Sequence, residues 1–253
     1  MTYQPKNSVF KKLERRLRIY KNTRNLDFSL ERPIVSITFD DFPKTAMTIG
    51  ARKMEVLGWA ATFYTAAGLA DSVNHHGPQF SPGDLLELEA RGHEIGGHTY
   101  SHADCAALSE PAVLAEIDKN IAALKAMGVA GNIESFAYPF GAATGALKGA
   151  LEPRFKSLRG ISGGVHTGRA DRNELKSYGF YSSTADAVIA QIEALAARPA
   201  WLTLFTHDIQ ERPTQWGCTQ GEFDRLLTAI QKSGAQVLPI TQAIKQLESR
   251  HAQ

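Results

Sequence analysis

The chain has 253 residues, of which 43% are apolar and 21% charged, a composition typical of a globular protein. Its 28 basic and 26 acidic residues give a net charge of +2, which does not predict nucleic-acid binding. No apolar run is long enough to span a bilayer, so membrane insertion is not expected either.

The N-terminal segment is basic and partly amphipathic. Residues 9–20 predict a surface helix that packs on the domain. Polar residues 21–25 follow the basic cluster where a signal peptide would have its apolar stretch, so we expect a cytoplasmic protein. We assign residues 1–32 to an N-terminal extension and residues 33–253 to one domain.

Strands and helices alternate along the rest of the chain. Apolar, β-rich runs predict strands at residues 34–39, 60–64, 94–97, 133–137, 157–161, 201–206 and 236–238. Amphipathic stretches with cap and stop signals predict helices at residues 45–57, 82–91, 109–127, 143–151, 184–197, 223–232 and 241–249. Ser81 and Ser109 are the expected N-caps of two of these helices.

This alternation predicts an α/β fold with parallel strands. Periodicity alone leaves a barrel and an open doubly wound sheet as alternatives. Polar clusters repeatedly follow the carboxyl ends of the predicted strands, where barrel enzymes build their active sites, and this modestly favours a barrel.

The first polar cluster is Thr-Phe-Asp-Asp at residues 38–41, directly after the first strand. A solvated turn would explain it, because aspartate favours turns. Two adjacent carboxylates at a strand end are nevertheless unusual for a surface turn. Alone, the pair supports a functional site only weakly.

The second cluster contains His98 and His102, preceded by two glycines. Two histidines four residues apart reach one metal ion from a helical turn or a curled loop. An aspartate as third ligand would leave a position open for water, as in catalytic sites. Surface histidines are the competing interpretation, but the glycine pair favours a specific backbone path.

Two further clusters lie at later strand ends. Phe-Ala-Tyr-Pro-Phe-Gly at residues 136–141 has the simpler interpretation of an aromatic turn that closes the core. His207 emerges from the strongly apolar strand at residues 201–206, which packing alone explains poorly. A hydrogen-bonded core histidine is the alternative for His207.

Taken together, the clusters resemble the polysaccharide deacetylase family, which is the NodB homology domain or carbohydrate esterase family 4. The similarity spans roughly residues 33–247. It is carried by Thr-Phe-Asp-Asp at 38–41 and His-Thr-x-x-His at 98–102, with the lead-in Gly-His-Glu-Ile-Gly at 92–96. The resemblance implies a distorted (β/α) barrel with seven strands, fewer than the regular eight.

The resemblance also implies roles for individual residues. Asp41, His98 and His102 would bind a divalent metal ion, with zinc as the usual ion and cobalt, nickel or iron also suited to imidazole ligands. Asp40 would be the general base that takes a proton from water, and His207 the general acid that protonates the leaving amine.

The aromatic turn is expected to contribute to substrate binding. Phe140 stands where the family supplies a backbone N–H to the oxyanion, and Tyr138 in the same turn is a further candidate for an oxyanion or substrate contact. Trp216, in the loop after His207, would either stack on a sugar ring or cover the edge of the barrel.

Two positions depart from the family pattern. Ala137 stands where many members have an arginine that steadies the catalytic aspartate, so we expect Arg159 to interact with Asp40 instead. The family's Asp-rich fourth motif is not recognisable, which leaves the partner of His207 undefined.

The remaining histidines and the cysteines have simpler interpretations. His75 and His76 are expected to be solvated, His166 to be a loop residue, and His93 to be structural. The two cysteines are too few for a disulfide framework, and buried thiols are expected, although Cys105 lies close enough to the histidine motif to leave a metal role open.

The predicted function is removal of N-acetyl groups from an amino-sugar oligosaccharide or polysaccharide. Hydrolysis of a cyclic amide or ureide is an alternative, but relatives with that activity commonly lack the metal triad. Hydrolysis of a sugar O-acetyl ester would use the same groups. A carbohydrate-binding relative without catalysis is the third alternative. The expected partner is thus an acetylated carbohydrate, and the sequence leaves the oligomeric state open.

Overall fold

The computed structural model describes residues 19–251, so most of the helix expected at residues 9–20 lies outside the described residues. The α-helices are α2 (Arg52–Glu55), α3 (Pro82–Ala90), α4 (Glu110–Ala126), α5 (Gly145–Leu151), α6 (Ala185–Ala194), α7 (Gln220–Lys232) and α8 (Ile240–His251). Among residues 19–251, no helix combines the length and the apolar character needed to cross a membrane.

The main sheet is parallel throughout. Its path is β10-β11-β2-β3-β6-β7-β8, and β12 pairs with the first residues of β2. These strands are β2 (Ile34–Asp40), β3 (Thr62–Thr65), β6 (Glu94–Gly97), β7 (Ser135–Ala137), β8 (Ser157–Arg159), β10 (Tyr178–Gly179), β11 (Trp201–Thr206) and β12 (Gln236–Val237). Two short antiparallel pairs accompany it, β1 (Asn25–Asp27) with β9 (Arg169–Asp171) and β4 (Val73–Asn74) with β5 (Gly77–Pro78).

The sheet curls, and one segment connects its two edges. Leu175 bridges to Arg159 at the end of β8, and Tyr178, three residues later, pairs with Leu204 of β11. This curl brings β8 toward β2 at the carboxyl ends of the strands. The structure thus confirms the predicted seven-stranded distorted (β/α) barrel, with β12 as an additional short strand.

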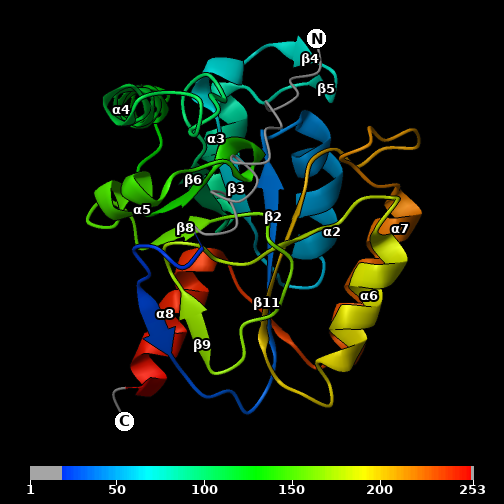
Figure 1. The fold of residues 1–253 in the computed structure, drawn as a ribbon. Coiled ribbons are helices and arrows are strands. Elements are labelled where there is room, and N and C mark those ends of the chain that lie inside the picture. The colour runs from blue at the N-terminus through cyan, green and yellow to red at the C-terminus, as the bar shows by residue number, and fades with distance from the viewer. Residues whose placement is uncertain (1–18, 252–253) are drawn as a thin grey trace.

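β2 and β11 lie at the centre of the fold (Figure 1). Every residue of both strands is buried, as expected for parallel strands covered on both faces. Phe39 of β2 stacks on Phe63 of β3 with ring centroids 4.9 Å apart. Below them, α8 and β1 cover a second apolar cluster that includes Trp201.

The predicted start of α3 is confirmed, whereas α7 begins three residues before the predicted residue 223, because a capping box at Thr219 sets its start. At α3, the Ser81 side chain accepts from the backbone N–H of Asp84, while the Asp84 carboxylate accepts from Ser81. Ser109 precedes α4 as expected but makes no capping bond through its side chain. The helix predicted at residues 45–57 is a π-helical segment (Ala46–Ala51) that continues as α2, and its Gly50 lies against Phe39, where a Cβ would come within 2.7 Å of the ring.

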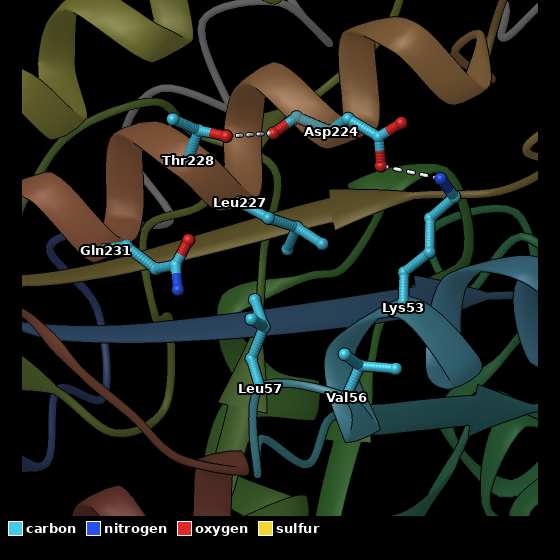
Figure 2. A pocket seen from close by; sticks show the side chains of 7 residues that line it. All are labelled: Lys53, Val56, Leu57, Asp224, Leu227, Thr228 and Gln231. Atoms are coloured by element: carbon cyan, nitrogen blue, oxygen red, sulfur yellow. Dashed lines mark hydrogen bonds and ion pairs between the residues drawn. The ribbon is translucent and has the colours of Figure 1, made fainter.

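A shallow hollow lies between α2 and α7 (Figure 2). Lys53 and Asp224 form an ion pair across it at 2.6 Å, and aliphatic side chains such as Val56 and Leu57 line the rest. Its lining residues contain no histidine or cysteine and no residue of the polar clusters at the strand ends.

Candidate active site

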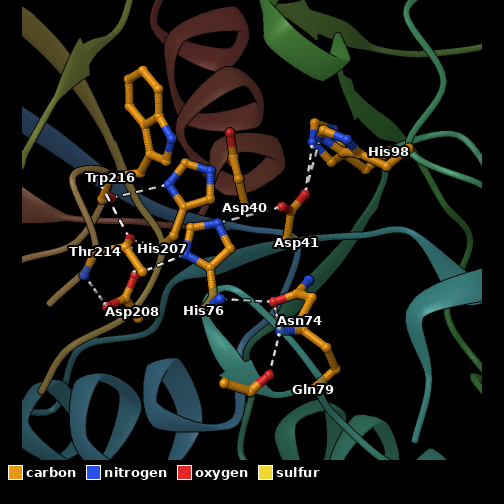
Figure 3. Close-up of polar contacts among 12 residues, drawn as sticks. Asp40, Asp41, Asn74, His76, Gln79, His98, His207, Asp208, Thr214 and Trp216 are labelled. Atoms are coloured by element: carbon orange, nitrogen blue, oxygen red, sulfur yellow. Dashed lines mark hydrogen bonds and ion pairs between the residues drawn. The ribbon is translucent and has the colours of Figure 1, made fainter. Parts of the chain in front are cut away.

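Asp40 and Asp41 are both buried at the end of β2, with 4% and 5% of their surfaces exposed. Side chains of adjacent strand residues normally point to opposite faces. Here the backbone leaves the strand at once, because Asp41 and Phe42 have φ angles of 64° and 66°. Left-handed backbone at non-glycine residues is concentrated at functional sites. The turn allows both carboxylates to face the same space (Figure 3).

His98 and His102 lie on a curled loop after β6. Their Nε2 atoms lie 3.5 Å and 3.1 Å from the same oxygen, Asp41 Oδ1. His98 Nδ1 is 2.8 Å from the carbonyl of Ala137. This contact makes Nδ1 the donor, so Nε2 presents a lone pair toward Asp41, as in histidines that bind metals. The predicted triad is therefore brought together.

The triad fits a divalent first-row metal ion. Asp41 Oδ1 is buried and makes no hydrogen bond within residues 19–251, although two imidazole nitrogens face it. Ligand atoms about 2.0–2.1 Å from a tetrahedral zinc ion lie roughly 3.3 Å apart, a value between the 3.1 Å and 3.5 Å that separate the two nitrogens from Asp41 Oδ1. Burial raises the pKa of Asp41, but the neighbouring His102 and His98 hold it well below its usual range. Burial lowers the pKa of His102 to about 4. Both groups thus favour their metal-binding forms.

Asp40 is held differently. Arg159 Nη2 donates to Asp40 Oδ2, as expected from the absence of an arginine at residue 137. The guanidinium is completely buried and lies 4.7 Å from the ring centroid of Phe205 and 5.1 Å from that of Tyr64. Asp40 Oδ1 is buried and has no hydrogen-bond partner in the described part of the chain. One carboxylate oxygen is thus anchored and the other is available to accept a proton.

His207 follows β11 and is half-buried. Its Nδ1 lies 3.1 Å from the carbonyl oxygen of Trp216, which makes Nδ1 the donor and leaves Nε2 available. Burial lowers the pKa of His207. A backbone carbonyl therefore orients this ring, in place of the carboxylate that the missing fourth motif would supply.

His76 and Asp208 are two site residues that the sequence analysis did not assign. His76 is only 2% exposed, so the expectation that it is solvated is wrong, while its neighbour His75 is indeed exposed. His76 Nδ1 lies 2.8 Å from Asp208 Oδ1, and its ring stacks on His207 with centroids 4.8 Å apart (Figure 3). No periodicity or motif marks a histidine in a short polar hairpin.

Phe140 and Tyr138 of the aromatic turn have different surroundings. Phe140 is 41% exposed, has a φ of 57°, and its ring meets the ring of His102 edge-on at 4.5 Å. Tyr138 is 1% exposed, packs against Phe136 and donates to the carbonyl of Asn173. Phe140 therefore borders the metal ligands, whereas the contacts of Tyr138 are those of a core residue.

Trp216 is 41% exposed, and its indole packs edge-on against Tyr181 with centroids 5.6 Å apart. Its carbonyl holds His207, so the aromatic ring and the histidine belong to one loop. The other residues considered lie in the core. His166 is buried against Trp201, and His93 bonds to Glu55 and to the backbone of Ala61.

Cys105 and Cys218 are both buried free thiols, as predicted. Burial raises the pKa of Cys218 to about 12, so it stays protonated at neutral pH. Within residues 19–251, neither cysteine belongs to a group with metal-ligand spacing, and the groups that do have it are built on Asp41 and histidines.

Comparisons with solved structures support the fold. The chitin deacetylase from Colletotrichum lindemuthianum is 17% identical, with a TM-score of 0.60 over 85% of this chain and 89% of that chain. The Xyl-CE4 domain of a multidomain xylanase from the hindgut metagenome of Trinervitermes trinervoides is 16% identical, with a TM-score of 0.60 over 85% and 91%. A CE4 family pseudoenzyme from Bacillus anthracis is 15% identical, with a TM-score of 0.56 over 84% and 65%.

A family model described as polysaccharide deacetylase matches residues 29–152. The matched segment contains the paired aspartates, both loop histidines and the aromatic turn, and the shared fold covers 85% of the chain. Residues 29–152 of this chain thus belong to the polysaccharide deacetylase family.

Proposed function

We propose that this protein is a metal-dependent hydrolase that removes N-acetyl groups from an amino-sugar oligosaccharide or polysaccharide. The proposal rests above all on the different partners of two adjacent carboxylates. Asp41 faces two imidazoles, whereas Asp40 is paired with Arg159. One carboxylate therefore serves a metal ion, and the other remains available for proton transfer.

Asp41, His98 and His102 would hold the metal ion, for which zinc is our proposal. When bound, such an ion lowers the pKa of water and polarises the acetyl carbonyl. Asp40 takes the proton of the attacking water at Oδ1, while Arg159 keeps Oδ2 in place. The backbone N–H of Phe140 is the proposed second donor to the oxyanion.

Breakage of the C–N bond requires a proton on the leaving nitrogen. His207 is the proposed donor, from Nε2, because Nδ1 is bonded to the Trp216 carbonyl. Burial lowers its pKa, so the imidazolium is a stronger acid, although a smaller fraction of the ring is protonated at neutral pH. The water oxygen ends in acetate, and the sugar leaves as a free amine.

A non-catalytic role is the second candidate, because a structural relative is described as a pseudoenzyme. In such a protein the carbohydrate would bind but never be deacetylated. The complete set of Asp40, Asp41, His98, His102 and His207 argues for catalysis instead. A sugar O-acetyl ester would be attacked by the same groups and differs only in its leaving atom.

The division of roles between the aspartates can be tested with two isosteric variants. Asp40→Asn should bind zinc with wild-type stoichiometry and lose about 100-fold or more in acetate release, since it removes only the base. Asp41→Asn should lose zinc binding itself. An Asp40→Asn variant that hydrolyses N-acetylated oligosaccharides at the wild-type rate would refute the assignment.

A further inference from the structure

His76 is a buried histidine that the mechanism above does not use. It lies in the turn of the β4–β5 hairpin, where its backbone N–H donates to Asn74 Oδ1 at 2.8 Å. Gln79 donates to the same oxygen at 3.0 Å, so the turn is braced without any contribution from the imidazole. The reason for a buried ring at this position must therefore lie in what the ring contacts.

Asp208 fixes one edge of the ring. This carboxylate has no exposed surface in its side chain and accepts from His76 Nδ1 at 2.8 Å. Gln210 Nε2 and the backbone N–H of Thr214 each donate to it at 2.8 Å, and Thr214 Oγ1 donates at 2.6 Å. These donors, His76 first among them, hold the pKa of Asp208 well below its usual range although burial raises it. Gly217 is required here, because a Cβ would lie 2.6 Å from the carboxylate.

The ring of His75 packs on that of His76 with centroids 3.9 Å apart, and other surfaces of the His76 ring face two functional residues. Its Nε2 lies 3.8 Å from Asp41 Oδ2, the oxygen opposite the one that faces His98 and His102. Its flat face lies against His207, with an interplanar angle of 9°. Figure 3 shows the ring of His76 between Asp41 and Asp208, with His207 above it. The imidazole therefore contacts both the metal-binding half and the acid half of the site.

We propose that His76, held by Asp208, is a positioning residue that aligns the ring of His207 and bounds Asp41 Oδ2. The inference rests on the proposed function and extends it to the hairpin β4–β5. His207 has one hydrogen bond within residues 19–251, to the carbonyl of Trp216, and one bond leaves its ring free to swing about that axis. A parallel ring packed against it removes this freedom.

The His76 ring also lies beside the carboxylate of Asp41. At 3.8 Å, the His76 Nε2 atom is too distant for a hydrogen bond but limits how far the carboxylate can turn toward the hairpin. Residues that orient a metal ligand typically change metal affinity by about 10- to 100-fold when removed. Misplacement of a reacting group by about 1 Å can cost on the order of 100-fold in rate.

The test compares His76→Ala and Asp208→Asn with His166→Ala, a control at a histidine that is equally buried but packs on Trp201. Zinc stoichiometry and zinc Kd are measured by competition with a chelator, and kcat and KM by acetate release at saturating zinc. His76→Ala should bind one zinc ion about tenfold more weakly and lose about 10- to 100-fold in kcat, with KM within about twofold. Asp208→Asn keeps the His76 ring but weakens the contact that holds it, so zinc Kd and kcat should change in the same directions by smaller factors.

The control should lower the melting temperature without changing zinc Kd or kcat. Wild-type zinc Kd and kcat in His76→Ala would overturn the inference. A zinc stoichiometry of two in the wild type and one in His76→Ala would also overturn it. His76 would then be a metal ligand together with Asp41 and His207, because the ligand atoms of these three residues lie within 4.8 Å of one another. If the wild type releases no acetate, the proposed function fails, and the zinc Kd of His76→Ala still decides the inference.

Discussion

Arg159 and Asp40 form a buried ion pair between β8 and β2, two strands that are not neighbours in the sheet. Their residues are 0% and 4% exposed, and 119 positions separate them in the chain. The curl of the sheet closes this gap. Because the aromatic rings of Phe205 and Tyr64 flank the guanidinium, the pair is shielded from water.

Loss of this arginine should affect stability and catalysis together. Arg159→Met leaves Asp40 buried without its partner, so the free energy of unfolding should fall by about 3–5 kcal/mol. Acetate release should fall as well, because the base loses its orientation. Denaturant titration and steady-state kinetics measure the two effects.

The double variant Arg159→Met with Asp40→Asn serves as the control. It removes both charges and should regain much of the stability but none of the activity. Equal stability of the wild type and Arg159→Met would contradict a tightly coupled buried pair.

Metal binding should stabilise the folded chain. Zinc at about 100 times its Kd should add roughly 2.7 kcal/mol to the free energy of unfolding and raise the melting temperature accordingly. His98→Ala should show no such rise, whereas His93→Ala should retain it, because His93 bonds to Glu55 and not to Asp41. A zinc-dependent rise in His98→Ala would place the ion elsewhere.

His166 should make stability depend on pH. Burial lowers its pKa from 6.5 to about 4, and its Nε2 has no hydrogen-bond partner among the described residues. Between these two values the unfolded chain binds a proton that the folded chain does not. The free energy of unfolding is therefore highest above pH 6.5 and falls by about 3 kcal/mol in total as the pH falls toward 4. His166→Phe should flatten the unfolding free energy over this interval, and an unchanged slope would contradict a neutral buried ring.

Trp216 is expected to contact the sugar. Its indole is 41% exposed beside Tyr181, on the loop whose carbonyl holds His207. Trp216→Ala should raise KM for an acetylated oligosaccharide by roughly fivefold, about 1 kcal/mol of aromatic contact, with little change in kcat. The KM of Trp216→Phe should lie between those of the wild type and Trp216→Ala. An unchanged KM would favour a covering role for the indole.

Local patterns predicted the strands and helices that are long enough to show them. The apolar runs that became β2 and β11 are examples, and the short strands β7, β8 and β12 were predicted from apolar residues, whereas β4, β5, β9 and β10 are equally short and were not predicted. The helix expected at residues 45–57 is π-helical over its first part, where Gly50 meets Phe39 of the sheet. That contact depends on tertiary packing, which a short stretch of sequence does not reveal.

The same distinction applies to the site. Asp40, Asp41, His98 and His102 are recognisable because short motifs carry them. The pairing of Arg159 with Asp40 was inferred only from a missing arginine elsewhere. His76 and Asp208 meet across 132 positions, and neither has a sequence neighbour that indicates the contact. Residues that orient a catalytic or metal-binding side chain through long-range contacts are therefore the hardest to predict from the sequence.

The central claim is tested most directly by acetate release from a panel of N-acetylated oligosaccharides, with metal-stripped wild-type protein before and after addition of zinc. The account predicts release only with zinc present, and release slower by about 100-fold or more from Asp40→Asn under the same conditions. Zinc bound at Asp41, His98 and His102 with no acetate released from any member of the panel would contradict it.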